Sequence, residues 1–439
     1  MANALGTLFL DSWRRARDIL RSKLGTNIVA LYVVQGMSYL APIAVLPHLL
    51  RALGPSAFGA VIFAQSVTAY LKIWTDFGFA FSATRDISIS REDRVETGRI
   101  FWSTLFAKAG LLVSGICVLS GLVLSVTTLR MHATLIAVSS TSAVGWTFMP
   151  QWYYQGQESM KFMAAVQAAT RVLFYGCLFL LVRNSHDVLS AAALLSAPAL
   201  VSAAICLGAI PRVLPVKWVR PSVKDIWAAL ASSWHLFLSG AATSLYLNTT
   251  VFIIGLVSGV YQVALYGIAN RVALAVFGIL SPISQALFPR MSLLFSKSHK
   301  EAKQFLKRVM GIFLLLASAM TISIFVFASA IISMFGGDKY AGAVNVLRVM
   351  AILPFLLALA TILSQFIMIN VGLTRQLSRI YVAAGVISLL LSWPLAKLLG
   401  ALGGALSLIA VEFIGPVLMF WVIWRSQVWC SNTDRHLTA

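Results

Sequence analysis

Long apolar runs separated by short polar segments fill the sequence from residue 27 onward. Each run has room for about 20 residues in a helix, which is the length that crosses the hydrocarbon core of a bilayer. The pattern therefore predicts an all-α polytopic membrane protein. The twelve expected transmembrane helices lie at 27–47, 57–75, 102–127, 133–149, 163–182, 188–210, 232–258, 261–288, 309–335, 343–370, 378–398 and 402–424.

The composition excludes several other classes of protein. Apolar residues make up 59% of the chain and charged residues only 11%, whereas soluble domains have about 45–50% and about 25%. A soluble enzyme, a disordered chain and a secreted disulfide scaffold are therefore ruled out. The four cysteines share no C-x-x-C spacing and are expected to be packing residues; they are Cys117, Cys177, Cys206 and Cys430.

The loop charges predict the orientation of the chain. The formal charge is +20, from 34 Lys and Arg against 14 Asp and Glu. If the N-terminus is cytoplasmic, 24 Lys and Arg fall on the inside and five in outside loops. Cytoplasmic loops are enriched in Lys and Arg, so both termini are predicted to be cytoplasmic. Because the basic residues lie between membrane helices, no nucleic-acid partner is expected.

The segments outside the apolar runs offer no catalytic apparatus. Residues 1–26 are basic, and no cleavage site follows the first apolar run, so we expect an uncleaved leader lying on the membrane. The loops are too short for a catalytic domain, and no phosphate-binding loop or hydrolase motif occurs. The chain is therefore predicted to be a carrier, not an enzyme, and to need no cofactor or metal.

A weak internal repeat divides the helices into six and six. Matching positions appear when the first half is shifted by 205 residues: Gly54 with Gly259, Ala64 with Ala269, Gln65 with Asn270, Val67 with Val272 and Arg85 with Arg290. Both halves begin on the same side of the membrane, which predicts parallel repeats. The predicted lobes are residues 1–215, which include the basic leader, and residues 216–439.

Two stretches of the first half carry a family resemblance. The motifs are Tyr39-Leu-Ala-Pro-Ile-Ala-Val-Leu-Pro47, Arg51-Ala-Leu-Gly-Pro-Ser-Ala-Phe-Gly59, Phe63-Ala-Gln-Ser66, Asp76-Phe-Gly-Phe79, Ser82-Ala-Thr-Arg85 and Trp152-Tyr-Tyr-Gln-Gly-Gln-Glu158. They resemble Wzx-type O-antigen and polysaccharide flippases of the multidrug/oligosaccharidyl-lipid/polysaccharide exporter superfamily. The second half resembles the family mainly through its helix pattern.

The resemblance implies a fold, a place and a substrate. The fold would be two six-helix lobes around a V-shaped cavity, in the inner membrane of a bacterium. The substrate would be an oligosaccharide unit on undecaprenyl pyrophosphate, made on the cytoplasmic face and turned over to the periplasmic face. The implied partners are this lipid-linked oligosaccharide, membrane lipid, the polysaccharide polymerase and the chain-length regulator.

Charged residues inside the apolar runs are the candidate site. The substrate-binding candidates are Arg171, Arg271, Lys108 and Arg348. A charge facing lipid at the bilayer centre costs at least about 2.5–3.5 kcal/mol. Arg171 and Arg271 each lie about ten residues, or roughly 15 Å, from either helix end. Snorkelling to an interface or pairing with a carboxylate would also account for such residues, but the surplus of arginine favours an anion-facing cavity.

Other polar and aromatic residues have two interpretations each. Glu412 is the only carboxylate well inside an apolar run, and it is either a salt-bridge partner or a site of proton or sodium coupling. Lys72 and Asp76 are spaced for an ion pair within one helix. Four aromatic residues either form an interfacial belt or stack on sugars; they are Trp146, Trp152, Tyr153 and Tyr154.

Three other functions remain open from the sequence. A multidrug or cation antiporter of the same superfamily would need buried acids, which are scarce here. A lipid II flippase would typically carry two more C-terminal helices. A membrane glycosyltransferase or polymerase would need a large outside loop, and the outside loops between these spans have no more than about nine residues.

Overall fold

The computed structural model describes the backbone of residues 23–426 and most side chains from residue 44 onward. Every regular element in this part of the chain is a helix. The elements are α2 (Lys23–Asp76), α3 (Phe79–Ile89), α4 (Arg94–Ser125), α5 (Thr127–Met131), α6 (Ala133–Phe148), α7 (Gln151–Gly156), α8 (Met160–Leu181), η1 (Ser185–Asp187), α9 (Val188–Val213), α10 (Val223–Val257), α11 (Val260–Gly278), α12 (Ser281–Lys297), α13 (His299–Gly336), η2 (Asp338–Tyr340), α14 (Ala343–Met350), α15 (Leu353–Thr361), η3 (Ile362–Met368), α16 (Thr374–Leu399) and α17 (Ala401–Arg425). The predicted basic leader lies almost wholly outside the described residues.

The predicted spans correspond to these helices. In the described part of the chain, nine helical stretches are long and apolar enough to cross a membrane. The other three predicted spans fall on the first part of α2, on α6 and on α10. The eighth span is divided into α11 and α12, and the tenth into α14, α15 and the π-helix η3. Pro282 and Pro354 each stand in the first turn after such a break, because proline fits a helix start but disrupts a helix interior.

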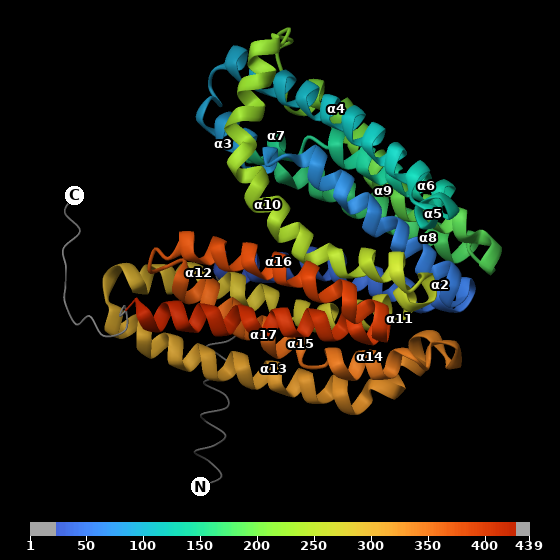
Figure 1. Ribbon diagram of the computed structural model, residues 1–439. Coiled ribbons are helices and arrows are strands. Elements are labelled where there is room, and N and C mark those ends of the chain that lie inside the picture. Colours follow the sequence, from blue (N-terminus) through green and yellow to red (C-terminus); the bar gives the residue numbers. More distant parts are fainter. Residues whose placement is uncertain (1–22, 427–439) are drawn as a thin grey trace.

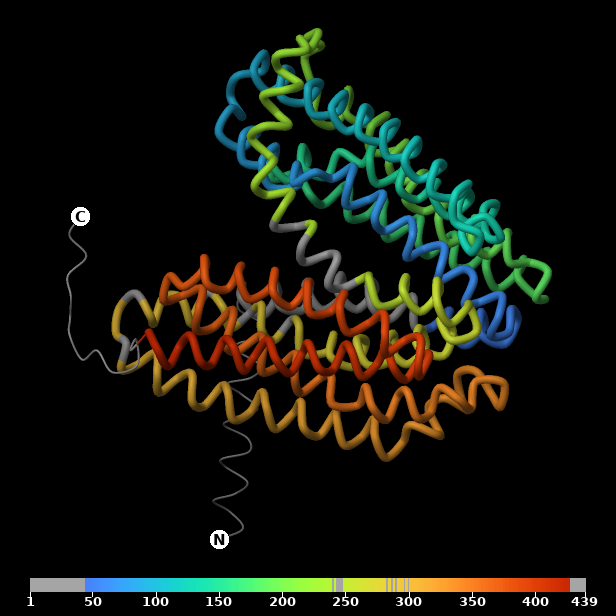
Figure 2. Tube along the Cα trace, viewed as in Figure 1, coloured from blue at the N-terminus to red at the C-terminus, as the bar shows by residue number. Residues whose placement is uncertain are grey.

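The helices form two bundles that diverge from one shared end (Figure 1). The upper bundle in this view holds α3 to α9, and the lower bundle holds α11 to α17. The second part of α2 belongs to the upper bundle and reaches α11 where the bundles meet. Helix α10 begins against α3 and α4 in the upper bundle and ends against α16 in the lower one (Figure 2).

The buried cores show which end is closed. One large core takes side chains from both bundles, including Val45, Leu135, Ile254 and Tyr340. The two remaining large cores are separate: one lies within α11 to α17 and the other within the upper bundle and the start of α10. Hydrophobic burial therefore joins the bundles at one end only. The other end carries α3, α7, α12 and the basic segments between spans.

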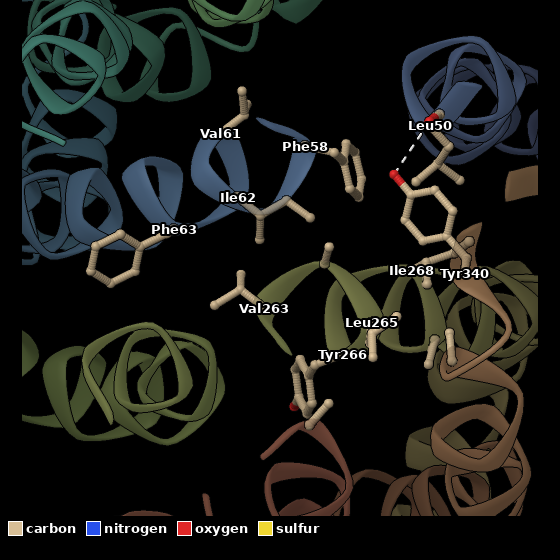
Figure 3. Packing of buried hydrophobic residues seen from close by; sticks show 14 of the residues in the cluster. Leu50, Phe58, Val61, Ile62, Phe63, Val263, Leu265, Tyr266, Ile268 and Tyr340 are labelled. Atoms are coloured by element: carbon tan, nitrogen blue, oxygen red, sulfur yellow. Dashed lines mark hydrogen bonds between the residues drawn. The ribbon is translucent and has the colours of Figure 1, made fainter. Parts of the chain in front are cut away.

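Close backbone contact between α2 and α11 fastens the closed end (Figure 3). A Cβ added to Gly59 would collide with the carbonyl group of Val260, and one added to Gly267 would lie 2.5 Å from Cδ1 of Ile62. Under the 205-residue shift, Gly59 corresponds to Ala264 and Ile62 to Gly267. The backbone nitrogen of Ala264 lies 3.1 Å from the same added Cβ of Gly59. Each residue thus meets its own repeat mate, as expected beside a twofold axis that relates the two halves.

Polar contacts strengthen this junction. The hydroxyl group of Tyr340 donates a hydrogen bond to the carbonyl oxygen of Leu50 at 3.3 Å (Figure 3). The guanidinium of Arg51 donates another to the carbonyl oxygen of Met334 at 2.6 Å. Both bonds join the first part of α2 to α13 and the loop that follows it.

The repeat is also visible in the backbone between the first two helices of each half. Gly54 has φ 72° and ψ 174°, and Gly259 has φ 84° and ψ 168°. Only glycine adopts this region without strain. The alignment of Gly54 with Gly259 therefore marks the same bend in both halves. The first helix of each half also contains a glycine, Gly36 or Gly240, but the helix continues through it without such a bend.

Two helix starts at the open end are fixed by acidic caps. Asp93 caps α4, and its carboxylate accepts hydrogen bonds from the backbone N–H groups of Val95 and Glu96. These bonds hold the pKa of Asp93 below its usual value. Asp225 and Ser222 form a capping box at the start of α10, and the Ser222 bonds lower the pKa of Asp225.

Candidate functional site

The candidate site follows one face of the second part of α2. Gln65, Lys72 and Asp76 are separated by seven and four residues, a spacing that places side chains on the same side of an α-helix. Gln65 and Lys72 line one cavity, and Lys72 and Asp76 line a second one. A polar stripe along an otherwise apolar helix inside the protein indicates an aqueous or ligand-bearing space.

The first cavity lies beside α2 within the upper bundle and has a volume of about 340 Å³. Helices α6, α8 and α9 complete its wall. Two cationic side chains line it, Lys72 and Arg171, together with hydroxyl, amide and aromatic groups. The full lining is Gln65, Lys72, Ser142, Gly145, Trp146, Met149, Gln167, Arg171, Tyr175, Leu195, Ser196, Pro198, Ala199 and Ser202.

A second cavity of about 300 Å³ adjoins the first toward the open end. The two share Lys72, Trp146 and Met149. Lys108 is buried in its wall, and its Nζ lies 3.8 Å from Oδ1 of Asp76. Asp76 therefore pairs with Lys108 on α4, and the predicted pair between Lys72 and Asp76 is wrong.

The packing explains the change of partner. The ammonium group of Lys72 lies 5.9 Å from the centre of the Trp146 ring, within the range of a cation–π contact. Lys108 is almost fully buried, so an unpaired ammonium there would be costly. Asp76, at the end of α2, therefore stabilises the buried Lys108 more than it would stabilise the partly exposed Lys72 on its own helix.

Arg271, in the other bundle, contacts the wall of the first cavity through Gln65. Its Nη2 donates a hydrogen bond of 3.2 Å to Oε1 of Gln65, and its Cζ lies 5.4 Å from the centre of the Phe58 ring. The guanidinium also interacts electrostatically with the phenol of Tyr175, which lines the cavity beside Arg171. Arg171 and Arg271 thus approach the same polar space from opposite bundles.

Together these residues form a cationic row from the open end to the junction. In order they are Lys108, Lys72, Arg171 and Arg271. Arginine binds phosphate through two parallel hydrogen bonds, and lysine binds it as a point charge. The serine, glutamine and tryptophan side chains in the wall are the groups that bind the hydroxyls and apolar faces of sugars. The row therefore suits an anionic ligand that carries hydroxyl groups.

The other two predicted site residues lie elsewhere. Arg348 is on the exposed face of α14, whose opposite face is buried. Glu412 is buried in α17, and its carboxylate interacts electrostatically with the phenols of Tyr266 and Tyr381. The binding and coupling roles assigned to these residues stay predictions.

The aromatic motif after α6 contributes to packing. The hydroxyl of Tyr153 donates to the carbonyl oxygen of Leu214 and that of Tyr154 to the carbonyl oxygen of Cys206. Both rings lie in the core of the upper bundle, so neither the interfacial belt nor sugar stacking applies to them. Trp152 is buried as well but lines the second cavity.

Sequence reasoning did not select Gln65, Lys72 or Gln167 as site residues. Lys72 resembled a snorkelling residue near a helix end, and the two glutamines carry no charge. The available signal was the spacing of Gln65, Lys72 and Asp76 on one helical face.

Solved structures with this fold are membrane transporters. An inward-closed structure of the lipid II flippase MurJ has a TM-score of 0.74 at 11% identity, over 90% of this chain and 87% of that one. An inward-facing multidrug resistance transporter of the MATE family and MOP superfamily has a TM-score of 0.65 at 14% identity, over 90% and 100%. These likenesses confirm the predicted fold class of two helical lobes.

Similar sequences point to surface polysaccharide. A protein of Escherichia coli (strain K12) named as an O-antigen transporter is 31% identical over 92% of this chain and 98% of its own. Its counterpart of the same name in Shigella dysenteriae is 29% identical over 90% and 98%. These names confirm the predicted transporter, as opposed to an enzyme.

Family models agree with these relatives. The MatE model matches residues 236–396, and the model described as Polysaccharide biosynthesis protein matches residues 24–295. With more than half of its length matched by this second model, the chain belongs to the polysaccharide biosynthesis protein family, as a multi-pass membrane transporter.

Proposed function

We propose that the protein turns over an undecaprenyl-pyrophosphate-linked oligosaccharide from the cytoplasmic to the periplasmic face of a bacterial inner membrane. The oligosaccharide would be the repeat unit of an O-antigen or another surface polysaccharide. The observation that carries the proposal is the cationic row beside α2, which extends from the open end to the junction of the bundles.

The charge of the row supports a pyrophosphate substrate. Lys72 and Arg171 line one polar space, Arg271 donates a hydrogen bond to Gln65 in its wall, and Asp76 pairs with Lys108. An anion bound there would add favourable charge interactions with cations that are costly to hold within a membrane. The polar and aromatic wall would then face the sugars.

The direction of transport follows from the loop charges. The open end carries the basic segments, and basic segments face the cytoplasm. The bundles would therefore receive the substrate from the cytoplasmic side. Alternating access would close this end and part the bundles at the junction of α2 and α11.

Two related functions fit the site less well. A carrier of cationic drugs would need acidic groups in its cavity, and the charged residues that line the two cavities beside α2 are Lys72, Lys108 and Arg171 against one acidic residue, Asp76. Lipid II is also a pyrophosphate-linked saccharide, so a lipid II-type flippase would use the same charges. The relatives named for O-antigen favour the surface polysaccharide over lipid II.

A deletion strain and vesicles test the proposal together. Loss of the gene should leave surface polysaccharide truncated and lipid-linked repeat units in the cytoplasmic leaflet, and the wild-type gene should restore both. Purified protein in vesicles should turn over a fluorescent lipid-linked oligosaccharide. A deletion strain with complete surface polysaccharide, together with inactive vesicles, would overturn the proposal.

A further inference from the structure

A third space, which is apolar, lies between the bundles on the other side of α2. It has a volume of about 600 Å³, within the range of about 300–1,000 Å³ that is typical of ligand sites. Helices of both bundles form it, and none of its lining residues belongs to the two cationic cavities. The apolar groove is lined by Val67, Tyr70, Leu71, Trp74, Gly115, Val118, Leu119, Leu122, Leu129, Thr249, Phe252, Ile253, Leu256, Leu389 and Trp393.

The groove has few polar side-chain groups, and those of Tyr70, Thr249 and Trp74 are hydrogen-bonded. The hydroxyl of Tyr70 donates to Oγ1 of Thr249 at 3.2 Å, and Nε1 of Trp74 donates to Oγ of Ser114 at 3.1 Å. These bonds leave hydrocarbon and aromatic surface facing the groove. Such a surface favours a hydrocarbon ligand and offers water few hydrogen bonds.

Aromatic pairs flank the groove, and residues at its side are exposed. At the open end of the molecule, stacked rings of Phe77 and Phe237, with centres 4.4 Å apart, join α2 to α10. Toward the junction, Phe63 stacks on Phe252. Val118 and Trp393, from opposite bundles, are well exposed. An apolar groove open between two membrane helices gives access to the lipid phase.

Helix α2 separates this groove from the cationic row. Its residues Val67, Leu71 and Trp74 face the groove, whereas Gln65 and Lys72 face the first cavity. Helices α2 and α10 are joined by the Tyr70–Thr249 hydrogen bond and by an edge-to-face contact between the rings of Tyr70 and Phe252. A molecule with an anionic head and a long hydrocarbon chain would thus find a place for each part on the two sides of one helix.

We propose that the apolar groove binds the isoprenoid chain of the transported lipid while the cationic row holds its pyrophosphate. The proposal rests on the proposed function, since it assigns a place to the chain of the same substrate. A bulk phospholipid would fill the groove with an acyl chain but has no need of the cationic row. The nearness of the row to the groove is therefore what selects the carrier lipid as occupant.

Photo-crosslinking tests the occupant at two matched positions of α4. Val118 lies in the groove and is 62% exposed, and Val113 lies outside it and is 64% exposed. Full-length Val118→p-benzoylphenylalanine and Val113→p-benzoylphenylalanine variants are placed in phospholipid vesicles with labelled undecaprenyl phosphate. We expect about tenfold more labelled product at position 118, and excess unlabelled undecaprenyl phosphate should abolish it. Equal yields at the two positions, or phospholipid products alone at 118, would overturn the proposal.

Transport by tryptophan variants separates this proposal from the proposed function. We expect Val118→Trp to lower the turnover of lipid-linked oligosaccharide about tenfold because the indole fills the groove, while Val113→Trp transports normally. If wild-type protein transports but both variants transport equally and crosslink equally, the groove assignment alone fails. If wild-type protein does not transport, yet position 118 still crosslinks undecaprenyl phosphate selectively, the proposed function fails and the groove remains an isoprenoid site.

Discussion

Arg271 of α11 and Gln65 of α2 are joined by a hydrogen bond of 3.2 Å between side chains that stand 206 residues apart. The bond crosses from one bundle to the other at the edge of the first cavity. Gln65 offers a neutral oxygen, so it satisfies one guanidinium hydrogen without neutralising the charge. The pair can therefore link the bundles and still attract an anion.

The first prediction distinguishes these two roles. Arg271→Ala should lower transport roughly tenfold to a hundredfold, because hydrogen bonds to charged groups contribute about 1.5–3 kcal/mol. Arg271→Lys should lose less, since it keeps the charge but not the paired grip on phosphate. Gln65→Ala should lose less than Arg271→Ala. Equal losses in Gln65→Ala and Arg271→Ala, measured as vesicle turnover, would show that only the link matters.

The second prediction compares two arginines that both lie in apolar spans. Arg171 lines the first cavity, whereas Arg348 is exposed on α14. Arg171→Ala should abolish complementation of the deletion strain while the protein remains in the membrane. Arg348→Ala should complement normally. The reverse result would place the substrate near α14 and remove Arg171 from the site.

The comparison of these arginines shows how far sequence reasoning reaches. Hydrophobic runs predict all the long helices, because bilayer thickness sets helix length. They do not predict which face of a helix points into the protein, so Arg348, although nearer a helix end than Arg171, was also a binding candidate. The packing of α14 against its neighbours leaves Arg348 on the exposed face.

For the same reason, the sequence does not predict which residues of distant helices pair with each other. Lys72 is four residues from Asp76, and that spacing favours a pair within the helix. Lys108 pairs with Asp76 because α2 and α4 pack together, which a single sequence does not reveal. The internal repeat, in contrast, can be recognised from the sequence. Gly54 and Gly259 match because the bend in each half has a positive φ, which favours glycine.

The third prediction concerns the junction of α2 and α11. Gly59→Ala places a Cβ against the carbonyl of Val260, and such overpacking typically costs about 1–3 kcal/mol. The variant should melt at a lower temperature in detergent and transport more slowly. Gly110→Ala is the control, since a Cβ there meets nothing within 4 Å. If Gly59→Ala were as stable as Gly110→Ala, α2 and α11 could move apart to admit the Cβ without loss of stability, and their close contact would not stabilise the junction.

The fourth prediction concerns orientation. A reporter that is active only in the periplasm, fused after Ala439, should stay inactive, because the basic segments predict that both termini are cytoplasmic. The same reporter inserted after Lys339, in the loop between α13 and α14, should be active. Activity at the C-terminus would reverse the predicted direction of transport as well as the topology.

The last prediction concerns the energy source and Glu412. Because the sequence holds no phosphate-binding loop, we expect transport to be driven by an ion gradient or by consumption of the product. Glu412 is buried in α17 near the phenols of Tyr266 and Tyr381, away from the residues that line the cationic cavities. A phenol can donate to the amide oxygen of glutamine as it does to a carboxylate. We therefore expect Glu412→Gln to keep its stimulation by an imposed pH or sodium gradient in vesicles. Loss of that stimulation, with transport in the absence of a gradient unchanged, would instead assign proton or sodium coupling to Glu412.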